Sequence, residues 1–523
     1  MSKKFNLLSL GVVYICFMTV YMTVREVLPL NFLIDSTLVS AAVFVPGFVL
    51  IVWDLLTKKN CLNGTAQDLL ILFLIVCCVS SVINLRFGIF GNVKFLATLV
   101  IEYFIFFSLT KNASSDQVTK ILNVVSATLI VTWFIPVLVS LLTYFFGIDI
   151  SVNNYGAYAI TSQGFSYEYV RLWGIFQDPN YASIISLVSV MASVRLIAQK
   201  KHWLVTILLA FNMLCQLCYI VLGGSRTALI LSVVAGFLFA VYRFVFNDKK
   251  KSLAQSFKGL GAALLSFVVF TAVLFGTKIA LPYAKTALFP GKTPMAAGVA
   301  SLYDGLYSLS GIDFELTQRT PEGDLMFTEE PETPEDPTTP PSTGTTTPID
   351  RTDLGKNDIS NGRFIRWTQT LDIFMKAPLF GTSPRNLSAF AKVHNPETLM
   401  AKYGIAPHNG YLDVLVETGI VGFGVLAIAV VWMLFSAIKR FLKRGFSYDR
   451  AFLLVSVLCF AGLAVFVSDV YMTFTINSMF FWLLLGMAHN LDTEPKENGV
   501  VFTVYSKTVG KLIRKLFNKK GSV

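Results

Sequence analysis

The sequence predicts an all-α polytopic membrane protein with about twelve transmembrane helices. Of its 523 residues, 54% are hydrophobic and only 14% are charged, whereas charged residues make up about 25% of a typical soluble domain. The mean hydropathy is +0.62. Apolar runs of about 20 residues, the length that crosses a ~30 Å hydrocarbon core, recur along the chain. Together these observations exclude a soluble globular protein.

The apolar runs begin near the N-terminus and are interrupted by one long polar stretch. We place them near residues 6–24, 32–53, 66–85, 89–109, 121–146, 181–199, 203–222, 227–246, 260–282, 411–437, 451–468 and 471–488. The first run follows Lys3 and Lys4, as in a signal peptide, but no small-x-small cleavage pattern comes after it. We therefore expect it to remain as the first helix.

The basic residues predict that both termini face the cytoplasm, because cytoplasmic loops of membrane proteins carry an excess of Lys and Arg. With the N-terminus inside, the basic residues gather at the inner connections and in the C-terminal tail: Lys58, Lys59, Lys111, Lys120, Arg195, Lys200, Lys201, Lys249–Lys251, Lys439, Arg440, Lys443, Arg444, Lys511, Arg514, Lys515, Lys519 and Lys520. This asymmetry explains the net charge of +11 without a nucleic-acid partner. The tail segment KLIRKLFNKK is expected to lie on the anionic inner leaflet of the lipid bilayer.

The spans divide the chain into six regions. From the N-terminus these are spans 1–5, an outer loop, spans 6–9, a large extracytoplasmic loop between spans 9 and 10, spans 10–12 and a basic cytoplasmic tail, at residues 1–146, 147–180, 181–282, 283–410, 411–490 and 491–523. Within the large loop, residues 320–350 form an acidic Pro/Thr tract that cannot bury a core, and we expect it to be a disordered spacer.

The fourth span carries Glu102 in its interior. A carboxylate inside the membrane is expensive and is a functional candidate by default. The alternative is that Glu102 pairs with Lys94 or another basic group for structure alone, and we favour this structural role.

The outer loop at 147–180 ends in VRLWGIFQDPNYAS, and Pro179 stands where a helix start tolerates proline. The QDPN turn could simply cap the next helix. Alternatively Arg171, which is the one basic residue of this loop, and the turn that ends at Asn180 contribute to a polar pocket. The sequence does not decide between these two interpretations.

Arg226 follows a Gly-Gly-Ser turn and begins the eighth span. An arginine at the outer face and at a helix start is doubly unfavourable without an anionic partner. Because guanidinium binds phosphate oxygens in a bidentate way, Arg226 is a candidate phosphate ligand. The alternative is an arginine that extends toward lipid phosphate.

In the large loop, GRFIRWTQTLDIFMKAPLFGTSPRN reads as an amphipathic helix that ends before Pro378 and a turn at Gly381. Arg363 and Arg366 are three residues apart, so both guanidinium groups can face the same way. Such a helix could lie on the membrane surface, or it could hold a second clamp for an anion.

The stretch Gly404–Gly424, GIAPHNGYLDVLVETGIVGFG, runs from a loop into the tenth span. Asn409, Asp413 and Glu417 follow one another at intervals of four and share one helix face. Helix capping by Asn409 and acids near the positive helix end would explain them. The other explanation is an active site at the outer membrane face in which His408 is the acid–base group.

Cysteines and histidines exclude several kinds of site. None of the seven cysteines falls in the large loop, so we expect no extracellular disulfide framework. Cys215 and Cys218 form a CxxC, but inside an apolar helix, where packing is the expected role. His394 and His408 are too few for a zinc site at the outer face. We expect no metal and no cofactor, and find no Walker loop or dinucleotide fingerprint.

The segments FQDPNYAS, GGSRTALI, GRFIRW with a following APLFGTSPRN, and HNGYLDVLVETGIVG occur in this order, with the large loop between the GSR and HN elements. This ordered set resembles the O-antigen ligase and polysaccharide polymerase superfamily of bacterial membrane glycosyltransferases. The resemblance extends from about Phe176 to Gly424. The Pro/Thr tract is an insertion relative to the family pattern, and His394-Asn395 is a second HN pair without the GYLDVLVETG context.

The resemblance implies a GT-C-like, metal-independent inverting glycosyltransferase of the bacterial cytoplasmic membrane, with its active site outside. It implies an undecaprenyl diphosphate-linked oligosaccharide as donor. Carried over by motif, Arg226 with Arg363, Arg366 or both would bind the diphosphate. His408 would take the proton from the attacking sugar hydroxyl.

Two activities are known in the superfamily that this chain resembles. A polymerase joins the repeat units of a capsule, exopolysaccharide or O-antigen on their lipid carriers, with a chain-length regulator and a flippase of the same pathway as expected partners. A ligase moves the finished glycan to a lipid, wall or protein acceptor. We favour the polymerase, since no acceptor-binding module is recognisable. A transporter or flippase for lipid-linked sugars is the alternative from another class, although paired repeats typical of transporters are absent.

Overall fold

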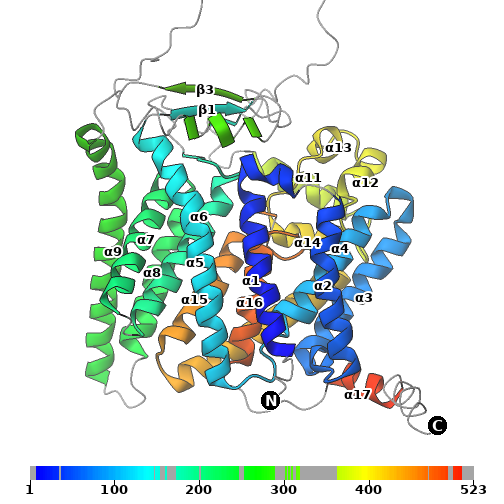
Figure 1. The fold of residues 1–523 in the computed structure, drawn as a ribbon. Coiled ribbons are helices and arrows are strands. Elements are labelled where there is room, and N and C mark those ends of the chain that lie inside the picture. Colours follow the sequence, from blue (N-terminus) through cyan, green and yellow to red (C-terminus); the bar gives the residue numbers. More distant parts are fainter. Residues whose placement is uncertain are drawn as a thin grey trace, which may run out of the picture.

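The computed structural model places the membrane helices of this chain side by side in one bundle (Figure 1). It describes residues 7–34, 37–146, 148–152, 160–161, 172–199, 202–246, 253–288, 301–302, 304–306, 308–309, 314–318, 362–468, 470–492 and 499–508. Arg171, the Pro/Thr tract at 320–350 and the KLIRKLFNKK tail lie outside these residues, so the predictions about them stay predictions.

Within the described part of the chain, ten helices are long and apolar enough to cross a membrane, which confirms the all-α polytopic class. They are α1 (Leu7–Glu26), α2 (Thr37–Leu56), α3 (Thr65–Ile83), α4 (Phe90–Ile101) with η4 (Glu102–Phe107), α5 (Ser115–Phe145), α6 (Pro179–Ile197), α7 (Trp203–Leu222), α8 (Arg226–Val245), α9 (Leu253–Leu288) and α14 (Gly410–Arg444). The shorter elements are η1 (Leu28–Leu33), η2 (Asn60–Leu62), η3 (Leu85–Phe87), α11 (Arg363–Phe374), α12 (Leu387–His394), α13 (Leu399–Tyr403), α15 (Tyr448–Leu463), α16 (Ile476–Asn490) and α17 (Val500–Lys507).

The last two predicted spans differ from the helices that form. In place of full spans at 451–468 and 471–488, α15 has 16 residues and α16 has 15. In the segment 464–475 between them, the described residues 464–468 and 470–475 are not helical. Two backbone carbonyl groups near the end of α15, those of Ala464 and Val467, accept hydrogen bonds from the N–H of Gly410 at 2.7 and 2.8 Å. A hydropathy pattern does not reveal such a tertiary contact. The predicted spans therefore extended into this segment from both sides.

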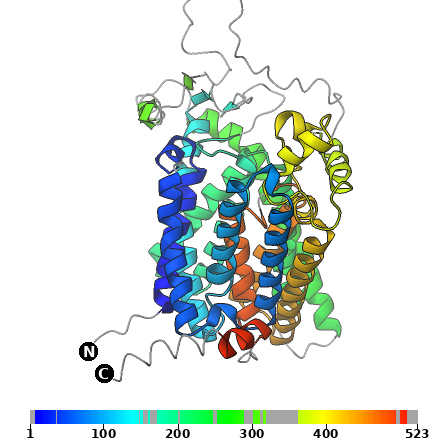
Figure 2. The ribbon, with the colours of Figure 1, turned by 90° about the vertical axis from the view of Figure 1, so that its right-hand side faces the viewer.

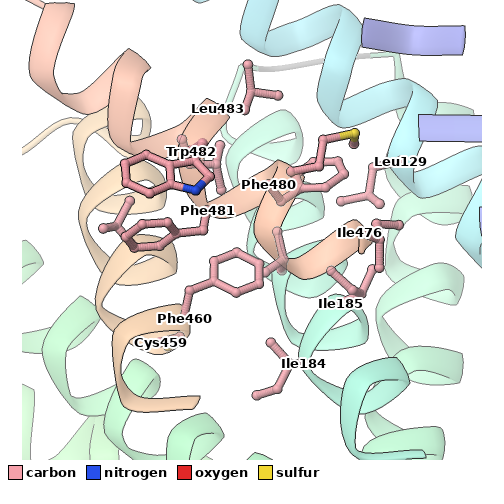
Figure 3. Close-up of a cluster of buried hydrophobic side chains, with 14 of the residues drawn as sticks. Leu129, Ile184, Ile185, Cys459, Phe460, Ile476, Phe480, Phe481, Trp482 and Leu483 are labelled. Carbon is pink, nitrogen blue, oxygen red and sulfur yellow. The ribbon is translucent and has the colours of Figure 1, made fainter. Parts of the chain in front are cut away.

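Helix α16 lies at the centre of the bundle, and all its residues are buried. Figure 3 shows Phe480, Phe481 and Trp482 of α16 packed among side chains of α5, α6 and α15. In a membrane the lipid is as apolar as these side chains, so helices associate through close van der Waals packing. This dense centre fixes the positions of the helix ends that surround it.

One end of the bundle is covered by polar segments. Helices α11, α12 and α13 lie at this end, which we call the capped end, and α17 lies at the opposite end (Figures 1 and 2). A small antiparallel sheet also lies here, with strand order β2-β1-β3. Its strands β1 (Ile148–Val152), β2 (Ile160–Thr161) and β3 (Phe314–Gln318) come from the two long predicted loops. The sequence did not predict this sheet.

Helix α14 is kinked at Gly419, whose φ of 68° and ψ of −176° are non-helical. The turn after α11 fills the kink: Ile420 N–H donates to Pro378 C=O at 2.8 Å, and Thr382 N–H donates to Val416 C=O at 2.8 Å. A Cβ atom at Gly419 would lie 2.2 Å from the carbonyl oxygen of Leu379. The APLFGTS and ETGIVG motifs are thus two halves of one backbone junction.

The kink predicts a large difference between two glycines of one helix. Gly419→Ala is expected to destabilise the protein by about 1–3 kcal/mol, because alanine is strained at this φ and has no space for its methyl group. Gly424→Ala is the matched control, since nothing lies within 4 Å of the added Cβ atom. It should be neutral or stabilising by up to about 1 kcal/mol. Thermal unfolding in detergent measures the stability of both variants. Equal Tm values for Gly419→Ala and Gly424→Ala would show that the kink does not require glycine.

Glu102 begins the π-helix η4 and is 2% exposed. No ion pair forms between Glu102 and any described residue, and Lys94 is exposed. The predicted pairing with Lys94 or another basic group is therefore absent among the described residues. Its polar neighbour is Ser478 of α16. Glu102 lies in the helix packing and away from the cluster of charges at the capped end.

Candidate functional site

The candidate site lies at the capped end, where five segments meet. Three of them are the N-termini of α6, α8 and α11, the fourth is the loop that precedes α14, and the fifth is the segment 464–475 between α15 and α16. Helix starts direct unpaired N–H groups and a partial positive charge toward the same region, which favours anions there. The charged side chains of these segments decide what the region can do.

Arg226 is the first residue of α8. Ser225 caps this helix by accepting a hydrogen bond from Ala228 N–H at 3.3 Å, and Gly224 before it has a φ of 59°. The N–H of Leu172 donates to the carbonyl of Leu222 at 2.8 Å, which ties the end of α7 to the segment before α6. The Gly-Gly-Ser turn therefore holds Arg226 at the capped end, where its side chain is exposed.

Arg363 is the first residue of α11, and its guanidinium lies over the ring of Phe466, 5.6 Å from the centroid. Burial lowers the pKa of Arg363; the neighbouring charge of Arg226 lowers it further, and Asp178 opposes the shift. Arg363, Arg226 and Asp178 are thus close enough to influence one another. Their helices are far apart in sequence, so only the fold brings them together.

His408 stands in the loop that leads into α14, with a φ of 54° that is uncommon for a residue other than glycine. Burial lowers the pKa of His408 to about 4, and the charges of Arg366 and Arg363 add to this effect. At neutral pH the imidazole is therefore uncharged and able to accept a proton. Both arginines therefore lie close enough to His408 to act on it.

The arginine–histidine cluster consists of Arg226, Arg363, Arg366 and His408, with Asp178 as its acidic neighbour. Three guanidinium groups against one carboxylate leave an excess of positive charge in a half-buried region. Neighbouring like charges are unfavourable unless an anion compensates them. The N-cap of α11 is Gly362, which has no side chain to cap the helix. This arrangement suits a phosphate or diphosphate group.

Asn409 and Asn180 have structural roles in helix starts. The Oδ1 atom of Asn409 accepts hydrogen bonds from the N–H groups of Tyr411 and Leu412 at 3.0 and 3.1 Å, so the capping explanation holds for this residue. At α6, Asp178 is the cap and Asn180 is a donor to it, through a backbone N–H at 2.6 Å from Asp178 Oδ1. The QDPN turn thus caps a helix and also supplies the acid beside Arg363.

Asp413 and Glu417 line one cavity of about 180 Å³, together with Arg385. They are two of the three residues that were predicted to share a helix face; the third, Asn409, does not line the cavity. The arginine–histidine cluster does not line this cavity. Its wall includes Pro407, the residue before His408.

Three residues near the predicted site were not among the predicted ligands. Asp178 belongs to the QDPN turn and Arg385 to the SPRN motif, so a sequence signal existed for both. Phe466 lies in an apolar run, and nothing in its sequence context marks it. In the described part of the chain, no group of three or more His, Cys, Asp or Glu side chains could hold a metal ion.

Comparison with known proteins agrees with the motifs. Residues 211–427 match the family model described as O-antigen ligase. The matched segment runs from α7 into α14 and contains Arg226, Arg363, Arg366 and His408. No curated protein matches the chain. The family match indicates a membrane glycosyltransferase of the O-antigen ligase or polymerase type.

Proposed function

We propose, from the premise that this chain is a member of the O-antigen ligase and polymerase superfamily, that it polymerises the repeat units of a bacterial surface polysaccharide. The donor would be an undecaprenyl diphosphate-linked oligosaccharide. One observation carries the proposal: arginines from two helices converge with a neutral histidine at one end of the bundle. Cations there suit a diphosphate leaving group, and a neutral imidazole suits a hydroxyl nucleophile.

The proposed step is an inverting displacement. The acceptor hydroxyl attacks the anomeric carbon of the donor sugar, the new glycosidic C–O bond forms, and the bond from C1 to the phosphate oxygen breaks. His408 accepts the hydroxyl proton, directly or through water. Arg226, Arg363 and Arg366 bind the diphosphate and stabilise the charge that develops as it leaves. In this scheme the arginines stabilise the leaving group without requiring a metal ion.

We place the capped end at the outer face of the bacterial cytoplasmic membrane and both termini in the cytoplasm. The support is the charge distribution, since the predicted inner connections carry the paired and clustered basic residues. A flippase that delivers the lipid-linked unit and a regulator of chain length are the expected partners of such an enzyme. Cysteine labelling from outside the cell at Ser388 in α12 and at Ser447, the N-cap of α15, tests this orientation. Only Ser388→Cys should react.

The site also predicts an unusual pH profile. The base must be neutral, so activity is lost as the pH falls through its pKa. With the pKa of His408 at about 4 in the free enzyme, kcat/KM should persist to about pH 5, well below the ordinary range of histidine. A bound diphosphate compensates the arginine charges, so the acid limb of kcat should lie at higher pH than that of kcat/KM.

Arg366 provides the control for this profile. Arg366→Gln removes one neighbouring charge and should move the acid limb of kcat/KM toward higher pH, whereas Arg366→Lys keeps the charge and should leave it in place. Initial rates of the wild type and the two variants between about pH 4 and 9 give the acid limb of kcat/KM and that of kcat. A wild-type acid limb of kcat/KM near pH 6.5 would contradict the assignment of His408, with its lowered pKa, as the general base.

The glycan profile of a strain that lacks this protein tests the function. The strain is complemented with the wild type or with His408→Ala, and lipid-linked sugar is separated from finally attached sugar. Single repeat units on lipid indicate a polymerase. Long chains that stay on lipid indicate the ligase alternative, and lipid-linked sugar held at the cytoplasmic face indicates a transporter. An unchanged profile with a normally expressed variant would remove His408 from the mechanism.

A further inference from the structure

The cavity lined by Asp413 and Glu417 is polar, and the mechanism above does not use it. Its volume is about 180 Å³, and its walls come from α12 with the turn before it, α13, the loop 404–407, α14 and the segment 464–475. Its polar lining consists of Arg385, Ser388, Asp413, Glu417, Ser468 and Thr473. Such a mixture of carboxylates, hydroxyls and one cation is suited to a ligand with several hydroxyl groups.

Glu417 is held in place by the backbone junction at the kink of α14. Its Oε1 atom accepts a hydrogen bond from the backbone N–H of Arg385 at 3.1 Å. Its own carbonyl accepts from Ser80 Oγ at 3.1 Å. Among the described residues the bond from Arg385 is the one hydrogen bond of the Glu417 carboxylate, so its Oε2 atom makes none. A side chain fixed in this way can offer one oxygen to a ligand with little loss of conformational entropy.

Two further features point to a ligand in this cavity. The Oγ atom of Ser468 is buried and has no hydrogen-bond partner among the described residues. Buried hydroxyl groups in proteins are nearly always satisfied by a protein group, an ordered water or a ligand, so this hydroxyl has the capacity to bond one more group. Met400 and Met472 also line the cavity and provide an apolar surface for the C–H face of a sugar ring.

The cavity and the arginine–histidine cluster meet at one loop. Residues 404–407 line the cavity, and the next residue is His408, whose surroundings are Arg363 and Arg366. Asn409 fixes this loop by capping α14. A ligand in the cavity therefore lies against the loop that carries the proposed base. The two carboxylates would repel a diphosphate, so the donor's leaving group belongs with the arginines and the cavity is left for the other substrate.

We propose that this cavity binds the terminal sugar of the acceptor glycan, with Asp413 and Glu417 accepting hydrogen bonds from its hydroxyl groups. The inference rests on the proposed function. The volume has room for one sugar residue and excludes a whole oligosaccharide. Carboxylates that bind the flanking hydroxyls orient the nucleophilic hydroxyl toward His408, which takes its proton as the bond to the donor forms. Asp413 and Glu417 are positioning residues that contact the acceptor.

The test uses the purified full chain and two probes. The donor is the lipid-linked repeat unit isolated from a strain that lacks the protein, and the acceptor is the oligosaccharide released from it by mild acid. We expect Glu417→Gln and Asp413→Asn to raise KM for the acceptor about 10- to 100-fold. KM for the donor and the slow hydrolysis of the donor by water should stay unchanged. Glu397→Gln is the control, because this exposed glutamate pairs only with Lys402 among the described residues.

A third variant covers the case in which the carboxylate variants fold poorly. Ser388→Trp fills the cavity from α12 and leaves both carboxylates unsubstituted. It should produce the same selective loss of acceptor binding. Wild-type protein that transfers no sugar from the lipid-linked donor would overturn the proposed function itself. If the wild type transfers sugar and all three variants keep the wild-type KM for the acceptor, only the acceptor-site inference is overturned.

Discussion

Replacing His408 with glutamine is expected to lower kcat for sugar transfer about 10²- to 10⁴-fold, which is the usual contribution of a general base. Glutamine can keep a hydrogen bond to the acceptor but cannot take its proton. Because the arginines are untouched, KM for the lipid-linked donor should change little. Initial rates with the purified protein and the isolated lipid-linked repeat unit measure both constants.

His394→Gln is the matched control for this variant. His394 is also followed by asparagine and also lies at the capped end, but it is exposed, and its Nε2 atom lies 3.2 Å from Arg86 Nη2. The control should keep wild-type activity. If both variants lose activity equally, the effect is not specific to His408. If neither loses activity, His408 is not the base.

Neutralising Arg363 should lower kcat/KM for the donor about 10²- to 10³-fold, the cost of removing one group that stabilises developing charge. Arg363 is half-buried over Phe466, so its interaction with a diphosphate is screened less than at an exposed site. Arg363→Lys keeps the charge but loses the bidentate geometry, and it should retain part of the activity. Rates at several donor concentrations separate binding from turnover.

We expect the effects of substituting Arg226 and Arg363 on activity to be coupled. Their charges influence each other, and both would bind one diphosphate. The double variant with glutamine at both positions should therefore lose less activity than the product of the two single losses. Arg86→Gln is the control, because Arg86 is an exposed arginine of the same end. Independent, multiplicative losses would indicate that the two arginines do not share a ligand.

The fold class followed from hydropathy because crossing a bilayer imposes a requirement on each helix separately. A segment of about 20 apolar residues satisfies its own backbone hydrogen bonds, wherever it lies in the bundle. The starts of α6, α8 and α14 were likewise marked by local signals, namely Pro179, Ser225 and Asn409. The segment 464–475 was misread as helix because it is apolar, whereas two of its carbonyl groups, those of Ala464 and Val467, accept tertiary hydrogen bonds from Gly410 at the start of α14.

By itself, the sequence determined which residues of the candidate site have the chemistry to bind an anion or to transfer a proton. Unfavourably placed arginines and a histidine before a helix are local features, and the GSR, GRFIRW and HN motifs carry them. The tertiary structure alone decided that Arg226, Arg363 and His408 meet, that Asp178 joins them, and that Asp413 and Glu417 face a separate cavity. The physical reason is that electrostatic effects and cavities depend on distances in space. Packing around α16 and the kink at Gly419 set those distances, and neither can be read from any one segment.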